Sequence, residues 1–538
     1  MSLAAAARGL VRGRARQRPP PVVWVPALLV ALGMLLLLAY LVARTLGAGS
    51  EALDLLLRPR TFWVAARTVA LAVTVTATAT ALAVPLAWLT VRTDLPFRRG
   101  WSLLTVLPLV IPSYVLGFVI IAAVGPRGIL QQALASLWGV ERLPDVYGFP
   151  GAVLALSLAT YPYMLLGLRA AWWGLDPALE ETSRSLGAGP WATFRRVVLP
   201  QLRPALGAGA LLVALYTLHD FGAVSLLRFE ALTQQIYVQY KGSFSRHLAA
   251  VLSLVLVGLA VLVVVLEARM RGRASYHRAA PGSARLPSLV HLGGWRWPAL
   301  LFCGAIVGLG VAMPVGVLGF WLWQGVSAGE PVKVLWGSAW NSLSVSVLAA
   351  VASLAAAVPV AVLGVRFPGW LARWAERTTY IGFALPGIVV ALALVFFGAN
   401  YVPWLYQTLA LLVLGYGVLF VAQAVGAVRT SLVQVNPRVE EMGRVLGSPP
   451  WRVLLTVTLP LVRPGLLAGA ALVFLTTMKE LPATLLLSPI GFHTLATKVW
   501  SATEDALFAR AAAPAILLVL VASLPLLWLL RQERQVRP

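Results

Sequence analysis

The stretch LEETSRSLGAGPWATFRRVVLP, residues 179–200, interrupts an apolar chain with two carboxylates, three arginines and a glycine-proline break. It returns as VEEMGRVLGSPPWRVLLTVTLP at residues 439–460, at a constant offset of 260 and without a gap. The adjacent glutamates, the glycine, the tryptophan and the final Leu-Pro pair recur at matching positions. This agreement indicates a duplicated chain in which each half carries the same polar element.

The composition indicates a membrane protein. The chain has 538 residues, of which 59% are hydrophobic and 12% charged, and its mean hydropathy of +0.84 is far too high for soluble domains. Apolar runs repeatedly reach the roughly 20 residues that a helix needs to cross about 30 Å of hydrocarbon. The strands of a membrane barrel would instead give short alternating segments. The sequence therefore predicts an all-α polytopic membrane protein.

Twelve membrane-spanning helices are predicted, six in each half. The predicted spans are residues 22–45, 61–91, 101–124, 149–173, 202–225, 247–268, 297–324, 339–365, 378–398, 402–428, 464–487 and 508–531. Because the polar element follows the fourth span of each half, both halves have the same orientation. This is a parallel repeat, related by an axis along the membrane normal.

The spans and the polar segments between them predict a domain organisation. The predicted parts are a basic cytoplasmic N-terminus at residues 1–21, a first six-helix domain at 22–268, a cytoplasmic linker at 269–296, a second six-helix domain at 297–531 and a cytoplasmic C-terminus at 532–538. The linker is rich in Arg, Pro, Gly and Ser, which is typical of a solvated connection.

The formal net charge of +24 raises the question of a nucleic-acid partner. Most of the 43 basic residues lie in segments, or next to spans, on one predicted side of the membrane. This asymmetry follows the positive-inside rule and predicts that both termini are cytoplasmic, so the charge requires no polynucleotide. The single cysteine, Cys303, lies in an apolar span, which argues against disulfides and thiolate metal clusters.

Each copy of the polar element predicts two short helices with a bend between them. Asp176-Pro177 and Asn436-Pro437 are helix starts, with a side-chain acceptor at the N-cap and a proline in the first turn. A glycine-proline break then ends the helix and starts the next one. An interfacial amphipathic connector would explain the arginines and tryptophans. It would not explain the repeated glutamates and glycine, which favour docking to a twofold partner.

The element resembles the cytoplasmic EAA loop of the permease subunits of ATP-binding cassette importers. In that family Glu-Ala-Ala is followed by three residues, Gly, nine residues and Ile-x-Leu-Pro. The matching residues are Glu181, Gly187, Val197, Leu199 and Pro200, and again Glu441, Gly447, Val457, Leu459 and Pro460. The departures are Thr182-Ser183 and Met442-Gly443 at the two alanines, and Val in place of Ile in both copies.

The resemblance implies a type I importer permease fold, in which each loop is a coupling helix seated in a cleft of an ATP-hydrolysing subunit. The expected coupling residues are Glu180, Glu181, Gly187, Leu199, Pro200, Glu440, Glu441, Gly447, Leu459 and Pro460. The chain has no G-x-x-x-x-G-K-[ST] phosphate loop. We therefore expect a transport subunit without cofactor or enzymatic activity of its own, which docks a pair of separate ATPase subunits.

Two further segments bear on the substrate. LHDFGAVSLL at residues 218–227, followed by T-x-x-I-Y at 233–237, and MKELPATLLL at 478–487 resemble the two-half permeases of the ferric-iron uptake family. Fused permeases for thiamine have the same architecture, so thiamine or another small solute is the alternative. The resemblance implies a prokaryotic inner-membrane importer whose external binding protein delivers the substrate at the outer face.

Asp220 and Glu480 are candidates for the substrate pathway. They lie 16 residues beyond Pro204 and Pro464, about 24 Å along a helix, which places them near the outer end. Such carboxylates usually face a protein interior or a water-filled path, and they would suit a hard cation, with Tyr216 one turn earlier. The alternative is that they are ordinary helix-end charges, paired with a neighbouring side chain or backbone group. No metal site is fixed by this pattern.

Two other classes of membrane protein, secondary transporters and membrane enzymes, fit this sequence less well. A secondary transporter needs buried titratable groups near the midplane for ion coupling, and the spans contain few. A membrane enzyme needs a polar constellation within its spans, which five histidines in total make improbable. An ATP-driven importer permease is therefore the predicted function.

Overall fold

The computed structural model describes residues 19–47, 49–126, 128–139, 144–242, 247–271, 289–329 and 335–535. Within these residues the chain is helical, and the one β-type contact is an isolated parallel bridge between Thr93 and Val290. Ten helices of this part are long and apolar enough to cross a membrane, or up to twelve if each of two bent pairs counts as one span. The predicted all-α polytopic fold is confirmed.

The chain divides into two compact units, which do not follow the two halves of the sequence. Unit 1 comprises residues 1–43, 340–492 and 522–538, and unit 2 comprises residues 44–339 and 493–521. Residues 1–18 of the predicted N-terminal segment, residues 272–288 of the predicted linker and the last three residues lie outside the described residues.

Unit 2 holds most of the helices of the first half. They are α3 (Gly49–Leu57), α4 (Pro59–Arg92), α5 (Arg98–Leu104), η1 (Leu107–Val110), α6 (Ser113–Val124), α7 (Ile129–Trp138), α8 (Phe149–Gly174), α9 (Pro177–Ser185), α10 (Pro190–Thr193), η2 (Phe194–Val198), α11 (Leu199–His219), α12 (Gly222–Leu226), α13 (Leu232–Gly242) and α14 (His247–Arg271). It also contains η3 (Gly293–Trp295), α15 (Arg296–Val307), η4 (Gly308–Ala312), α16 (Met313–Ser327), α26 (Leu495–Glu504) and the start of α27 (Phe508–Gln535).

Unit 1 holds most of the helices of the second half. They are α2 (Pro21–Leu46), α17 (Leu335–Arg366), α18 (Trp370–Ala384), α19 (Gly387–Tyr401), α20 (Leu409–Gln434), α21 (Pro437–Val445), α22 (Pro450–Val453), η6 (Leu454–Thr458), α23 (Leu459–Leu461), α24 (Arg463–Lys479), α25 (Pro482–Leu487) and the end of α27. The helices α8 and α20 have equal lengths and begin 260 residues apart, so the repeat extends upstream of the polar element.

The first span of each half packs in the unit built mainly from the other half. In unit 1, Tyr40 of α2 meets Phe397 and Tyr401 of α19 edge-on, at ring-centroid distances of 5.9 and 5.8 Å. In unit 2, Gly310 approaches the η1 helix so closely that a Cβ there would lie 2.9 Å from the Pro108 ring. The packing units and the sequence repeat are thus different divisions of the chain.

Four predicted spans are interrupted in the structure, at 101–124, 202–225, 378–398 and 464–487. The pair α18 and α19 is bent by 102°. Leu385, at this bend, is extended at φ −88° and ψ 131°, since the following proline excludes it from the helical region. Pro108 and Pro112 flank the equivalent breaks of the first half. The prediction of one continuous helix is wrong at these places. Proline ends the hydrogen-bond ladder within 101–124 and 378–398, whereas the breaks within 202–225 and 464–487 lie at the extended residues Asp220 and Glu480.

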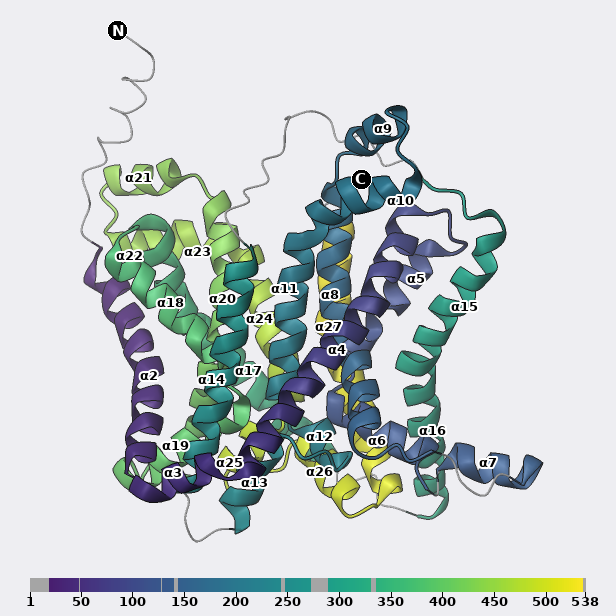
Figure 1. The fold of residues 1–538 in the computed structure, drawn as a ribbon. Helices are drawn as coiled ribbons and strands as arrows, with labels where there is room; N and C mark the ends of the chain where they lie inside the picture. Colours follow the sequence, from purple (N-terminus) through teal and green to yellow (C-terminus); the bar gives the residue numbers. More distant parts are fainter. Residues whose placement is uncertain are drawn as a thin grey trace. The chain divides into compact units, whose positions relative to one another are not determined.

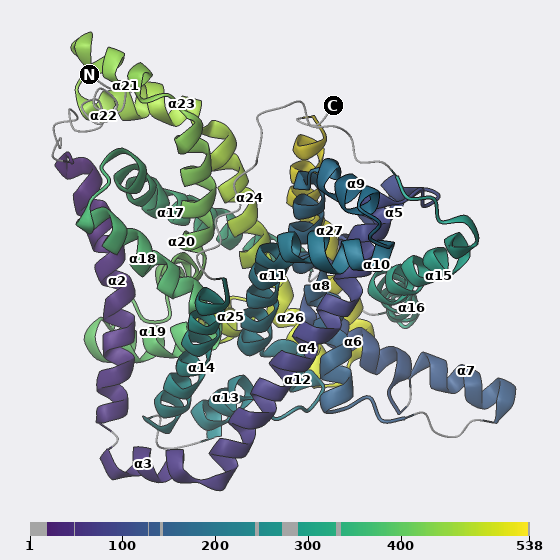
Figure 2. The same cartoon turned by 45° about the horizontal axis from the view of Figure 1, so that its top comes forward.

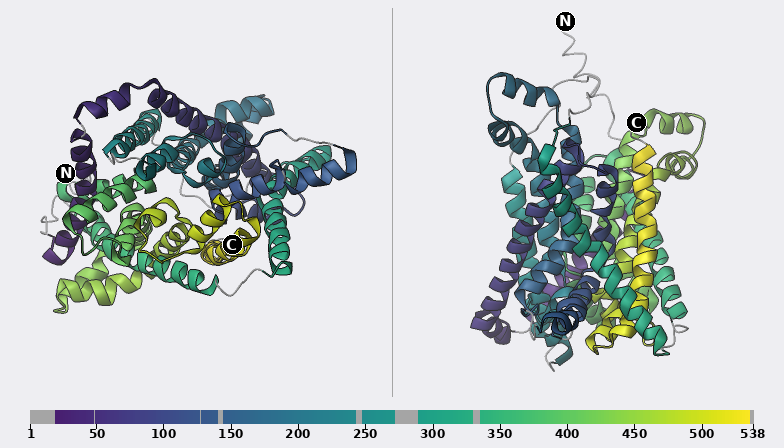
Figure 3. Two further views of the ribbon diagram at one scale, coloured as in Figure 1. Left: turned by 90° about the horizontal axis from the view of Figure 1, so that it is seen from below. Right: turned by 90° about the vertical axis from the view of Figure 1, so that its right-hand side faces the viewer.

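Each unit has two distinct ends (Figure 1). In unit 2, α9 and α10 lie at one end, while α12, α13 and α26 lie at the other. In unit 1, α21 and α22 lie at one end, and α19 and α25 at the other. We call the end with the polar element the loop end of its unit. At the opposite end of unit 2, α3 lies across the N-terminal end of α4 (Figure 2), and α7 extends outward (Figure 3).

Candidate functional site

The candidate site consists of two loops with matching structure, loop 1 at residues 176–200 and loop 2 at residues 436–460. Each begins as predicted: the Asp176 side chain accepts a hydrogen bond from the N–H of Ala178 at 3.0 Å, and Asn436 accepts one from Arg438 at 3.1 Å. A proline in the first turn follows each cap, where its missing N–H costs nothing. The resulting helices α9 and α21 are nine residues long in both loops.

A glycine in the left-handed region ends each of these helices. Gly187 has φ +83° and Gly447 has φ +86°. The N–H of Gly187 donates to Arg184 O at 2.9 Å and that of Ala188 to Ser183 O at 3.1 Å, which is a Schellman ending. A Cβ would meet nothing within 4 Å at either glycine. Glycine is therefore required by the backbone conformation and not by lack of space.

The next segment contains a π-helical turn in both loops. After the short helices α10 and α22, residues Phe194–Val198 and Leu454–Thr458 have π geometry. The N–H of Leu199 bonds to Phe194 O, and that of Leu459 to Leu454 O. Pro200 and Pro460 come next and have no N–H to continue the α pattern, which explains the wider turn. Leu199 and Pro200 thus start the long helix α11, whereas Leu459 and Pro460 start the three-residue α23, and the chain bends by 75° between α23 and the long helix α24.

The first glutamate of each pair is an internal anchor. Glu180 Oε2 lies 2.8 Å from Arg92 Nη2, and the two side chains are 11% and 4% exposed. Glu440 Oε1 accepts hydrogen bonds from Arg366 Nε at 3.1 Å and Nη2 at 2.9 Å, and from Thr458 Oγ1 at 3.1 Å. The arginines end the long helices α4 and α17. Each loop is therefore fixed to its unit by a buried ion pair.

The outward side of each loop is partly apolar. Glu181 and Glu441 are exposed, and so are Leu186 and Leu446, at 83% and 81%. Trp191 adds an indole that is 72% exposed. Several exposed apolar side chains within one short segment are typical of an interaction site. This side has the character of a docking surface.

Loop 1 lies next to the end of the linker. Val290 N–H donates to Arg92 O at 2.8 Å, and Asp94 N–H donates to Val290 O at 3.3 Å. The Asp94 carboxylate accepts from the Leu292 N–H at 2.9 Å and lies 3.0 Å from His291 Nδ1. These hydrogen bonds, the backbone one foremost, hold the pKa of Asp94 below its ordinary value. The junction fixes the chain just before α15 against the end of α4.

The candidate pathway carboxylates are helix caps in this structure. Asp220 follows α11, where it accepts hydrogen bonds from the N–H groups of Ala223 at 3.0 Å and Val224 at 3.3 Å, and from the Ser113 hydroxyl. Glu480 follows α24 and accepts from the Ala483 N–H at 3.1 Å. A backbone group is one of the two alternative partners that the sequence offers for Asp220, beside His219, and these hydrogen bonds fit it; for Glu480 the alternative partner from the sequence is Lys479.

The ring of Tyr216 packs against that of Tyr163 at a centroid distance of 5.7 Å, with the two ring planes tilted by 40°. The positions 260 residues later hold Gln423 and Thr476, whose side chains are joined by a 3.3 Å hydrogen bond. The same contact between two helices is therefore aromatic in one half and polar in the other.

Sequence reasoning missed Arg92 and Arg366, the partners of the buried glutamates. They are 274 residues apart, whereas the loops are 260 apart, so the repeat at the loop offset does not align them. A signal was present, because Pro85 and Pro359 of the same two helices share the offset of 274. Counting forward from these prolines to a common basic residue would have found both arginines.

Comparisons with known proteins agree with this duplicated arrangement. The family described as "Binding-protein-dependent transport system inner membrane component" matches the chain twice, at residues 79–272 and 351–538, and each match includes one loop. The chain is 35% identical over 517 residues to the Fe(3+)-transport system permease protein FbpB 2 of Haemophilus influenzae, covering 95% of this chain and 98% of that protein.

Two more distant relatives match a smaller share of this chain. The identity is 24% over 468 residues to the ferric transport system permease protein FbpB of Actinobacillus pleuropneumoniae, which spans 81% of this chain and 66% of that protein. It is 34% over only 137 residues to the molybdenum transport system permease protein ModB of Escherichia coli strain K12, 26% of this chain and 58% of that protein. Similarity along the whole chain is thus found with a ferric permease.

Proposed function

Because the chain belongs to the family of binding-protein-dependent transport system inner membrane components, we propose that it is the membrane permease of an ATP-driven importer of ferric iron. One observation carries this proposal: the similarity to an Fe(3+)-transport permease runs through 95% of the chain. Membership of this family also removes the reason to consider a secondary transporter.

The two loops receive the ATPase in this proposal. Each presents an exposed leucine and an exposed glutamate, while its other glutamate is tied to a long helix by a buried ion pair. A force on the outward side of a loop is thereby transmitted to α4 or α17. Since one chain carries both loops, it docks a pair of ATPase subunits, and ATP hydrolysis belongs to that separate pair. Glu180, Gly187, Leu199 and Pro200, with their counterparts in loop 2, shape each loop.

The orientation follows from the position of the loops. Docking of an ATPase places the loop ends at the cytoplasmic face of the inner membrane of a prokaryotic cell, with both chain termini on that side. A substrate-binding protein then delivers iron at the opposite face. Transport requires the helices to alternate between inward-open and outward-open arrangements as ATP binds and is hydrolysed.

The test is ATP hydrolysis by the chain reconstituted in lipid together with its ATPase. Ferric-loaded and thiamine-loaded binding proteins from the same cell are added in separate reactions. We expect stimulation by the iron-loaded protein alone. Stimulation by the thiamine protein would retain the importer and replace the substrate, whereas failure to form any ATPase complex would contradict the importer itself.

A further inference from the structure

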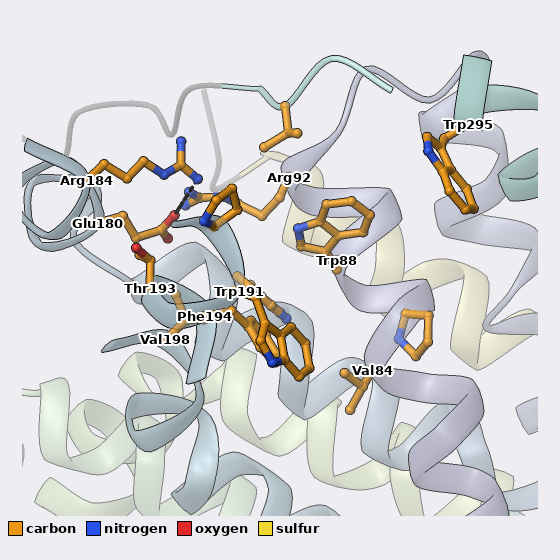
Figure 4. A pocket seen from close by; sticks show the side chains of 14 residues that line it. Val84, Trp88, Arg92, Glu180, Arg184, Trp191, Thr193, Phe194, Val198 and Trp295 are labelled. Carbon is orange, nitrogen blue, oxygen red and sulfur yellow. Dashed lines mark hydrogen bonds and ion pairs between the residues drawn. The ribbon is translucent and has the colours of Figure 1, made fainter. Parts of the chain in front are cut away.

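A cavity of about 780 Å³ lies at the loop end of unit 2, where nothing in the proposed function uses it. Its walls come from the last turns of α4, the end of α8, loop 1 and the segment before α15. Figure 4 shows Arg92, Glu180 and Arg184 together at the upper left, Trp88 and Trp295 to their right, and Trp191 and Phe194 below them. The cavity is therefore amphipathic, with a broad aromatic wall and a compact charged corner.

Three buried polar atoms in this wall have no hydrogen-bond partner among the described residues. They are Arg92 Nη1, Glu180 Oε1 and Trp172 Nε1. The three residues are 3%, 8% and 2% exposed, and all of them line the cavity. Buried polar groups are nearly always paired, so each such atom calls for an explanation. Together they are two donors and one acceptor, on three residues that line the same cavity.

Loop 2 has no such set of atoms. Arg366 places both Nε and Nη2 on Glu440 Oε1, and its Nη2 also donates to Val435 O at 3.1 Å. Thr458 supplies a further donor to the same carboxylate oxygen. In the described part of the chain, neither Arg366 nor Glu440 has a buried atom without a partner.

One substitution between the copies explains part of this difference. The position of Thr458 in loop 1 is held by Val198, which lines the cavity and has no hydroxyl to offer. Thr193, the polar residue nearby, lies 3.1 Å from Ser183 Oγ instead. The Glu180 carboxylate thus lacks the hydroxyl donor that Glu440 has, because the matching residue is apolar in this copy.

We propose that this cavity binds the headgroup of an anionic phospholipid with a hydroxyl-bearing headgroup, of which phosphatidylglycerol is the simplest. Two guanidinium groups and one carboxylate give the lining a formal charge of +1, which a single phosphodiester neutralises. The phosphate accepts from Arg92 Nη1 and Trp172 Nε1, and a headgroup hydroxyl donates to Glu180 Oε1. The tryptophan-rich wall takes the start of the acyl chains, as tryptophans do at membrane interfaces.

The position of the site gives the bound lipid a role, which rests on the proposed function. Its walls include Arg92 of α4 and Glu180 and Trp191 of loop 1, so an occupant bridges the loop and the helix that anchors it. A bound headgroup therefore stabilises loop 1 in the position seen here. Loop 2 needs no such occupant, because protein groups already satisfy its ion pair.

The experiment is native mass spectrometry of the full chain, purified in detergent and exposed to phosphatidylglycerol or phosphatidylcholine. We expect one phosphatidylglycerol to be retained per chain, with clear preference over phosphatidylcholine. Val198→Thr supplies the donor that Thr458 supplies in loop 2, so it should weaken phosphatidylglycerol binding by about tenfold, the value of one charge-assisted hydrogen bond. The matched control, Thr458→Val, should leave this binding unchanged.

Three results would overturn the lipid site: equal retention of the two lipids, equal binding by the Val198→Thr variant, or displacement by millimolar inorganic phosphate. The last would show a site for a free anion. Val198→Thr is a conservative substitution, so it avoids the unfolding that a substitution of Arg92 would risk. Because this measurement uses neither ATPase nor binding protein, its failure is distinct from a failure of the proposed function. ATPase rates in discs with and without phosphatidylglycerol then test the role at loop 1, which equal rates would contradict.

Discussion

Arg92 and Glu180 form a buried ion pair of 2.8 Å that joins the end of α4 to the first helix of loop 1. The corresponding pair in unit 1, Arg366 and Glu440, is 2.9 Å long and is also buried, but it carries additional hydrogen bonds. Both pairs lie under a surface that we propose receives the ATPase. They connect the outward side of each loop with a membrane-spanning helix.

Loss of either arginine is expected to destabilise the chain and uncouple ATP hydrolysis from transport. Arg92→Ala or Arg366→Ala leaves a buried carboxylate without its partner, which typically costs about 3–5 kcal/mol. Thermal unfolding in detergent, followed by size-exclusion chromatography, measures the loss. Arg184→Ala is the comparison, since Arg184 is 51% exposed and lies 3.9 Å from Glu180, a geometry worth about 0–1 kcal/mol. Equal effects of all three variants would contradict the anchoring role.

Substitutions at the two loop glycines are expected to act through the backbone. Alanine at φ +83° or +86° has room for its Cβ, so its cost is the left-handed conformation, about 1–2 kcal/mol. Gly187→Asn should cost less than Gly187→Ala. Gly187→Pro should be worst, because it also removes the N–H that donates to Arg184 O.

The matched control is Gly189→Ala. Gly189 lies two residues further on, has φ −65° and likewise has open space around it. Transport by reconstituted complexes should follow the order Gly189→Ala, Gly187→Asn, Gly187→Ala, Gly187→Pro, from highest to lowest, with membrane insertion retained throughout. A Gly189→Ala variant as impaired as Gly187→Ala would show that the left-handed turn is unimportant.

The exposed leucines of the loops are expected to be required for ATPase docking. Leu186→Ser and Leu446→Ser should weaken the complex, since burying one leucine side chain is worth about 1.5–3 kcal/mol, or about tenfold or more in affinity. Leu57→Ser is a suitable control, because Leu57 is 80% exposed but lies in α3, at the opposite end of unit 2. Co-purification of the ATPase measures the effect, and undiminished recovery with both loop variants would place docking elsewhere.

The sequence predicted the local features of the loops because these depend on neighbouring residues. The Asp176 cap, the turn at Gly187 and the Leu-Pro helix start each involve a few consecutive positions, and the second copy repeats the cap and the turn. The anchoring arginines were missed because they are 88 and 74 residues from their glutamates. Packing decides such pairs, and a different offset in the upstream helices hid the equivalence.

Two features of the fold illustrate different limits of prediction from the sequence: the packing of each half's first span in the other unit, and the breaks within spans. An apolar helix such as α2 does not encode which neighbours it will meet, since both units offer apolar surfaces, so its place in unit 1 could not be predicted. The breaks could have been predicted, because Pro108, Pro112 and Pro386 lie inside the supposed spans and restrict the preceding residue. Because the spans were assigned from length and hydropathy alone, each was taken as one helix although a proline interrupts it.

Asp220 allows the pathway hypothesis to be tested against the capping seen in the structure. Asp220→Asn keeps an oxygen that can accept from the N–H groups of Ala223 and Val224, but it removes the charge. If the carboxylate only caps α12, iron uptake should stay near wild type with Asn and fall with Ala, together with thermal stability, by about 1 kcal/mol for a lost cap. If it attracts a cation, Asn should fail as badly as Ala while stability is kept. From the geometry we expect the first result. Glu480→Gln should behave in the same way, since its Oε1 accepts from Ala483 N–H in the same manner.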